Sequence, residues 1–288
     1  MTNAEITRHE VEALYSREAV VEPVMRAIGR ACEEPMAMVR FLSRYANLNG
    51  WFGSGVAALA GKIGRSRSVF LDPEEPIEDI ADRSVLVGSY FFDAARDEFD
   101  DRDTPHRDTH RCLAQACIKA TYFYYLNTSQ LRGHQVFTTV NEMLKQPLWL
   151  QGIGSRVATG YGVTTSDISI ELFRSMGYHL GSEILADAEF SLIDVAMRNR
   201  LPALTHYLQT TEVEIAGQKH NGYAWIGLHS GHGASKEADH FAWATQGVNE
   251  ALKYTRPENR DELRHQVHLG IGSFVRDHQE FFAHVSLD

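Results

Sequence analysis

Cysteine is scarce in this sequence, and the shortage limits the kinds of site that the chain can build. Only three cysteines occur, Cys32, Cys112 and Cys117, and no Cys-x-x-Cys motif is present. So small and odd a number cannot supply a disulfide framework or a thiolate cluster for a structural zinc ion. Any metal site in this protein must therefore use nitrogen and oxygen ligands.

Positive charge is also in short supply. The formal net charge is −10 and the pI is about 5.8, so the chain lacks the basic surface with which nucleic-acid-binding proteins contact phosphates. We therefore expect no nucleic-acid partner.

Long apolar runs are missing as well. No stretch reaches the roughly 18 residues expected of a membrane span, and the polar start MTNAEITRHE lacks the apolar region of a signal peptide. These absences favour a cytoplasmic protein without a membrane partner.

The remaining patterns predict an all-α protein. Prolines number only eight, alternating apolar and polar runs are few, and three- and four-residue spacings recur. No convincing linker divides the chain, so we expect one domain over residues 1–288; the oligomeric state stays open, with a homodimer as one option. The expected helices cover about residues 5–33, 36–63, 76–99, 105–126, 168–198, 237–252 and 259–284.

Boundary signals refine these expectations. Asp72-Pro73 and Thr104-Pro105 each combine an N-cap residue with a proline that suits a first helical turn, so we expect helices to begin there. Residues 127–168 are rich in Gly, Thr and Ser and predict a loop-bearing connection, and residues 201–223 predict a short helix followed by a polar turn, GQKHNG.

The most informative stretch is Gly227–Leu252, GLHSGHGASKEADHFAWATQGVNEAL, which holds four candidate metal ligands. Glu237 and His240 share a helical face with Phe241, Ala244, Val248, Ala251 and Leu252, so both polar groups should point into the core. A buried carboxylate is costly unless a proton, cation or metal neutralises it. Inward Glu-x-x-His pairs are also a unit of carboxylate-bridged di-iron bundles. The other two candidates are His229 and His232.

Candidate ligands also lie on earlier helices. Glu98 ends the apolar stripe Val87, Phe91 and Ala94, although it could instead be solvated among the acidic residues of RDEFDDRD. His106 and His110 lie one turn apart, and His110 continues along the apolar side through Leu113 and Cys117. His110 is therefore the better inward candidate.

Glu183 lies near the middle of the helix expected over 168–198. It follows Leu172, Met176, His179 and Leu180 on one face. Metal ligation and a buried ion pair with Arg174 or Arg198 are both open for this carboxylate. Gly181 beside it would admit close approach of another helix or of a ligand.

Together these residues resemble the heme-oxygenase-like di-iron oxidases and oxygenases over about residues 35–253. The resemblance rests on EEPMAMVRFLSRYANLNGWFGSGVAALAGKI, RSVLVGSYFFDAARDEFDD, THRCLAQA, SMGYHLGSEILADAEFSLID and the His/Glu/His stretch, in this order. It implies a single-domain helical bundle that binds two Fe(II) ions and uses O2 to oxidise a small amino-acid-like or fatty-acid-like substrate in specialised metabolism. The implied ligands are Glu98, His110, Glu183, His232, Glu237 and His240, with His229 and His106 as rivals.

Two spacings depart from the family pattern. The family's last group usually reads His-x-x-x-Asp-x-x-His, whereas this sequence has one more residue between His232 and Glu237. A π-bulge or a helix start near Gly233 would accommodate it. The gap between Glu98 and His110 is also about two residues longer than usual, which keeps His106 as a rival.

Two other functions stay open on the same scaffold. One is a metal-free enzyme, either a thiaminase-II-like hydrolase with a nucleophilic cysteine or a cofactorless oxidase; the other is a non-catalytic heme-binding or interaction protein. The substrate cannot be named from the sequence. Aromatic residues that could line its pocket are Tyr122, Phe123, Tyr124, Trp149, Tyr161, Trp225 and Trp243.

Overall fold

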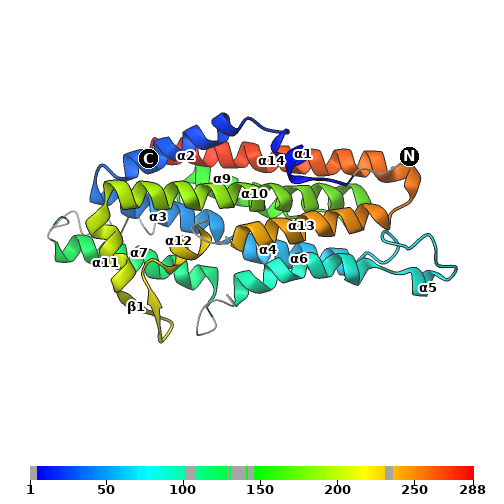
Figure 1. The fold of residues 1–288 in the computed structure, drawn as a ribbon, viewed down its shortest axis with the longest axis horizontal. Helices are drawn as coiled ribbons and strands as arrows, with labels where there is room; N and C mark the ends of the chain where they lie inside the picture. Colours follow the sequence, from blue (N-terminus) through cyan, green and yellow to red (C-terminus); the bar gives the residue numbers. More distant parts are fainter. Residues whose placement is uncertain (1–4, 101–107, 129, 131–140, 142–145, 231–235) are drawn as a thin grey trace.

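A computed structural model describes residues 5–100, 108–128, 130, 141, 146–230 and 236–288. It shows an elongated bundle of helices (Figure 1) whose buried apolar residues form one continuous core. The all-α class expected from the sequence is thereby confirmed. None of the described helices is both long enough and apolar enough to cross a membrane.

Two long helices run along the length of the bundle. They are α10 (Ser169–Arg200) and α14 (Arg260–Val285), and they pack along much of their length. Their backbones come into contact at a glycine on each helix: a Cβ atom on Gly177 would overlap the Val267 carbonyl oxygen, and one on Gly270 would overlap that of Arg174. A Cβ on Gly181 would lie 3.1 Å from Phe274 Cβ, so this glycine admits another helix, as expected.

The other helices surround this pair. In Figure 1, α4 (Phe52–Arg65), α6 (Ser84–Phe99) and α13 (Lys236–Lys253) lie towards one end of the bundle. Towards the other end lie α2 (Arg17–Ala31), α3 (Pro35–Asn49), α7 (His110–Asn127), α11 (Pro202–Thr210) and α12 (Ala224–His229), and α9 (Leu148–Gly160) packs against α14. Residues at the junction between the two groups are therefore in a position to meet.

The first two expected helices are each divided. The 5–33 segment forms α1 (Arg8–Glu12) and α2, because the Ser16 hydroxyl caps a new helix by accepting from the Ala19 amide. The 36–63 segment forms α3 and α4, which meet at Gly50 and Trp51.

The helix starts expected at the two prolines need correction. Asp72 does not cap a helix: its carboxylate accepts from the Glu74 amide and from Arg83, and helix begins only at α5 (Glu78–Ala81) and α6. The helix expected from residue 105 begins at His110, where the Thr109 hydroxyl accepts from the Cys112 amide at 3.0 Å. Thr104, Pro105 and His106 lie outside the described residues.

Regular structure also occurs where the sequence predicted loops. The 127–168 connection contains α9. The GQKHNG segment is not simply a turn, since β1 (Glu212–Ile215) pairs in antiparallel fashion with β2 (Gln218–Asn221). Ala216 and Gly217 turn the chain with φ values of 53° and 81°. The long helices over 168–198 and 259–284 are confirmed by α10 and α14.

Candidate metal centre

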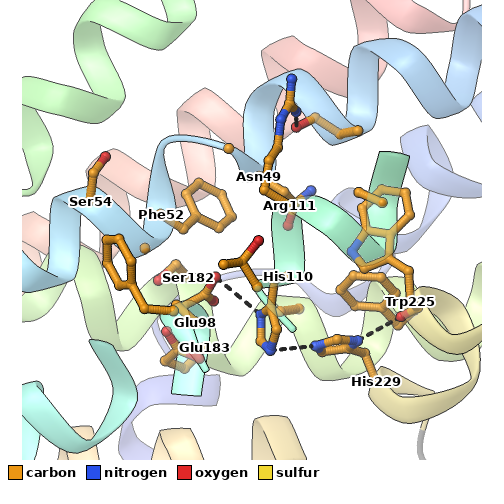
Figure 2. Close-up of a pocket in the computed structure, with 18 residues that line it drawn as sticks. Asn49, Phe52, Ser54, Glu98, His110, Arg111, Ser182, Glu183, Trp225 and His229 are labelled. Carbon is orange, nitrogen blue, oxygen red and sulfur yellow. Dashed lines mark hydrogen bonds and ion pairs between the residues drawn. The ribbon is translucent and has the colours of Figure 1, made fainter. Parts of the chain in front are cut away.

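Several candidate ligands converge on one pocket at the junction of the bundle. Glu98 of α6, His110 of α7, Glu183 of α10 and His229 of α12 all line it (Figure 2). The cavity measures about 200 Å³. Glu98 is only partly exposed, so it is not the solvated residue that its acidic neighbours would also allow.

A first chain of contacts runs along the pocket wall. Glu98 Oε2 lies 3.0 Å from His110 Nδ1, and His110 Nε2 lies 3.3 Å from His229 Nε2. His229 Nδ1 in turn lies 2.6 Å from the carbonyl oxygen of Trp225 (Figure 2). Both histidines thus have an oxygen acceptor at Nδ1 and face each other through Nε2.

This arrangement determines what can lie between the two imidazoles. A neutral imidazole carries one N–H, and the oxygen acceptors place it on Nδ1 in both rings when Glu98 is ionised. Both Nε2 atoms then present lone pairs to each other, which is unfavourable unless a proton or a metal cation is shared. Two adjacent nitrogen ligands at about 2.1 Å from one ion lie about 3 Å apart. The observed separation of 3.3 Å fits both a hydrogen bond between the two rings, in which a proton is shared, and two nitrogen ligands of one ion.

Local structure holds this first chain in place. The Thr109 cap fixes the start of α7, so His110 is its first residue. Glu98 reaches His110 past Gly53, where a Cβ atom would lie 3.0 Å from Glu98 Cβ and 3.4 Å from Glu98 Oε2. His229 ends α12, and its Nδ1 is held by the carbonyl group one turn earlier, a contact that orients metal-binding histidines in many proteins.

A second chain of contacts lies deeper. His240 Nε2 is 3.1 Å from Asp97 Oδ2, and His240 Nδ1 is 3.4 Å from Glu183 Oε2. The other oxygen of Glu183 is 3.1 Å from His179 Nδ1. All four side chains are buried, and each of the two carboxylates contacts at least one imidazole.

The ion pair considered for Glu183 does not form with either arginine suggested by the sequence. Arg174 donates to Gln266, and Arg198 donates to Asp194. The inward face predicted for the helix that carries His240 is present in the part of it that the structure describes. Its residues are all buried: His240, Phe241, Ala244, Val248, Ala251 and Leu252.

Asp97 and His179 are site residues that the ligand prediction missed. His179 lies on the stripe that predicted Glu183, one turn earlier, and this spacing is a signal for a histidine–carboxylate contact on one helix. Asp97 had no comparable signal, because it lies off the stripe that ends at Glu98.

Within the described residues, no three His, Cys, Asp or Glu side chains form one group that could hold a metal ion. The contacts are instead pairwise. His106, His232 and the side chain of Glu237 lie outside the described part of the chain, so the structure brings together Glu98, His110, Glu183, His229 and His240. Carboxylate oxygens and imidazole nitrogens are a donor set suited to iron.

The rest of the pocket wall is largely apolar. Phe52, Phe190 and Trp225 contribute aromatic surface, and Trp225 belongs to the aromatic set expected near a pocket. Arg111 and Asn49 add polar groups, with Arg111 Nη1 donating to the Ala46 carbonyl oxygen. A small, mostly apolar molecule with a polar end would fit such a wall.

Neither cysteine of α7 is part of this wall. Burial raises the pKa of the Cys117 thiol to about 12, although a hydrogen bond with Thr121 lowers it slightly. Cys112 is partly buried and does not line the pocket. The described site therefore contains no activated thiolate.

Comparison of the chain with protein-family models, with curated proteins and with solved structures finds no match.

Proposed function

We propose that this protein is a non-heme di-iron oxidase or oxygenase that uses dioxygen to oxidise a small organic substrate. The observation that carries the proposal is the pair of facing Nε2 atoms of His110 and His229, 3.3 Å apart, with an oxygen acceptor at each Nδ1. The resemblance to heme-oxygenase-like di-iron enzymes supports the same conclusion from the sequence.

The iron ligands would be Glu98, His110, Glu183, His229 and His240, together with Glu237. For the position at which the resemblance suggested His232, which lies outside the described residues, we choose His229, because it contacts His110. When bound, two ferrous ions would supply the electrons that reduce dioxygen, a reaction that carboxylate and imidazole side chains cannot perform.

The protein's own residues prepare the pocket for such a reaction. Glu98 holds the proton of His110 on Nδ1, and the Trp225 carbonyl holds that of His229 on Nδ1, so both Nε2 atoms are kept as ligands. Phe52 and Phe190 limit water in the pocket, which strengthens electrostatic interactions there. Arg111 and Asn49 provide polar contacts for one end of a substrate.

The other functions have less support. A thiaminase-II-like hydrolase would use a thiolate, and the high pKa of Cys117 disfavours one in α7. No contact described above favours a cofactorless oxidase or a heme-binding protein over the di-iron enzyme.

The test is metal loading of purified protein. We expect anaerobic iron(II) to bind at two ions per chain and dioxygen uptake to follow, with zinc giving a folded but inactive protein because zinc has no redox chemistry. His110→Ala and His229→Ala should each lower iron content, whereas His265→Ala, at an exposed position of α14, is the matched control.

Iron content measured by mass spectrometry and dioxygen uptake measured with an oxygen electrode would decide the matter. Unchanged two-iron loading in the His110→Ala/His229→Ala double variant would contradict the site. Turnover under argon with zinc would contradict the chemistry.

A further inference from the structure

Three ionisable side chains meet behind the wall of the pocket, on helices α3, α10 and α14. Tyr45 donates its hydroxyl proton to Glu189 Oε2 at 2.9 Å, and His278 Nε2 lies 2.8 Å from Glu189 Oε1. Their exposed fractions are 1% for Tyr45, 6% for Glu189 and 2% for His278. A phenol, a carboxylate and an imidazole are thus in contact and almost fully removed from solvent.

The phenolic proton of Tyr45 already points at an acceptor. The Tyr45 hydroxyl donates to Glu189 Oε2, and His278 Nε2 lies against the other oxygen of the same carboxylate. Among the described residues, no arginine or lysine contacts Glu189. A proton that leaves the Tyr45 hydroxyl therefore has a carboxylate oxygen within hydrogen-bond reach.

One-electron oxidation of Tyr45 requires its phenolic proton to leave, and Glu189 Oε2 is placed to accept it. Two other buried tyrosines donate to carboxylates, but an arginine donates to each of those carboxylates as well, so they already have a charged donor besides the tyrosine. These pairs are Tyr178–Asp277 with Arg156, which also contacts Glu280, and Tyr223–Asp194 with Arg198.

Tyr45 is also connected to the candidate metal centre through aromatic rings. Its ring centroid lies 5.3 Å from that of Trp225 and 5.5 Å from that of Phe190. Both of these residues line the pocket, and Phe190 stacks on His229 with 4.8 Å between ring centroids. A continuous path of packed rings therefore joins His229 to Tyr45.

We infer that Tyr45 is a redox-active residue that donates one electron towards the metal centre when dioxygen reacts there without substrate. The inference rests on the proposed function, since the oxidant is iron oxidised by dioxygen. The Tyr45 O–H bond breaks, the proton moves to Glu189 Oε2, and the electron passes through Phe190 or Trp225 to reduce the centre by one electron. A neutral tyrosine radical remains, and the pocket side chains are spared from oxidation.

The experiment uses the full chain loaded anaerobically with iron(II) and mixed with oxygenated buffer in the absence of substrate. Samples are frozen at intervals and studied by electron paramagnetic resonance. We expect the signal of a neutral tyrosine radical, which narrows when the protein is made with ring-deuterated tyrosine. Tyr45→Phe should abolish the signal, whereas the matched variants Tyr178→Phe and Tyr223→Phe should retain it.

A second variant tests the proton acceptor. Glu189→Gln keeps the size of the side chain but cannot take the proton in the same way, so we expect the signal to form about 100-fold more slowly, the lower end of what a positioned proton acceptor contributes. This variant also gives a result should Tyr45→Phe fail to fold.

Two outcomes would overturn the inference alone. One is a tyrosine signal of undiminished yield in Tyr45→Phe; the other is two-iron binding and dioxygen uptake by the wild-type protein with no tyrosine signal, which leaves the proposed function intact. Failure to bind iron or to consume dioxygen would overturn both.

Discussion

At the scale of single residues, Gly53 decides how closely Glu98 can approach His110. The Cβ, Cγ and Oε2 atoms of Glu98 all lie against the space where a Gly53 side chain would be. The Glu98 carboxylate holds the tautomer of His110 through a 3.0 Å contact. Displacing this carboxylate by a few tenths of an ångström would therefore shift His110 Nε2 relative to His229 Nε2. The site thus depends on a residue that is not a ligand.

We predict that Gly53→Ala lowers iron(II) affinity about tenfold, the lower end of the effect of mutating outer-shell partners. It should leave stability unchanged or raise it by up to about 1 kcal/mol, because alanine favours helix over glycine. Gly61→Ala in the same helix is the control, since its Cβ would meet no atom within 4 Å. Competition titration and thermal unfolding measure the two effects, and equal iron affinity in both variants would contradict the prediction.

Residue patterns predicted much of the candidate site and missed part of it for identifiable reasons. Glu183 and His240 were predicted because each lies on the apolar face of its own helix, and that face points into the core whichever helix packs against it. The contact between His110 and His229 depends on how α7 and α12 meet, which no local pattern contains. Asp97 was missed because its partner, His240, lies on α13, far along the chain.

At the scale of elements, the short helix α1 shows how the beginning of the described chain is held to the bundle. The amide of Ile6 donates to Asn249 Oδ1 at 2.8 Å, and Asn249 Nδ2 donates back to the Ile6 carbonyl oxygen at 3.0 Å. Glu10 contacts Arg264 and His268 of α14. Burial raises the pKa of Glu10, but the hydrogen bonds and charges of Arg264 and His268 outweigh it and hold the pKa below its usual value of 4.5.

This lowered pKa predicts acid-sensitive docking of α1. The contribution of Glu10 is complete above its unfolded pKa of about 4.5 and is lost as pH falls through the lower folded value. Its size should be at most about 1 kcal/mol, as for partly exposed ion pairs. The protection factors of the α1 amides, which correct the exchange rates for the rate of an unstructured chain at each pH, should fall below pH 4.5 in the wild-type protein. Glu10→Gln should lower them already at neutral pH, while Glu12→Gln, which removes an exposed contact with Arg8, should not; identical protection in all three proteins would contradict this.

Helix ends were harder to predict than helix interiors. Interiors follow from repeated apolar spacing, which α10 and α14 display over many turns. Asp72 has the composition of a cap, but Arg83 and the Glu74 amide satisfy its carboxylate in a turn instead. The hairpin was missed because Ala216-Gly217 is a weaker turn signal than Asn-Gly or Asp-Gly.

At the scale of the whole molecule, the packing of α10 against α14 is the contact around which the other helices are arranged. Gly177 and Gly270 each let the backbone of the other helix come into contact, and apolar side chains build the core around this contact. The all-α class was predictable from composition and spacing, whereas this pairing was not, because a glycine's role in close packing depends on a partner that the sequence does not name.

We therefore predict that Gly177→Ala or Gly270→Ala destabilises the protein by about 3 kcal/mol or more, since each new methyl group would overlap a backbone carbonyl that cannot move independently. Gly272→Ala on the same helix as Gly270 is the control, because its Cβ would meet only the end of the Arg276 side chain, at 3.7 Å. Urea unfolding followed by circular dichroism measures the differences. A midpoint for Gly177→Ala equal to that of Gly272→Ala would show that the helices do not cross as described.

The contact between His110 and His229 joins residues that are 119 positions apart, and the contact between Asp97 and His240 joins residues 143 positions apart. Closing such long loops is entropically costly, so these pairs should form late in folding, after local helices and the α10–α14 pairing. An ion bound between them would link the two halves of the chain and stabilise the native state by an amount that grows with the logarithm of the ratio of its concentration to its Kd. Supply of iron would then govern how long the folded protein survives, as well as whether it is active.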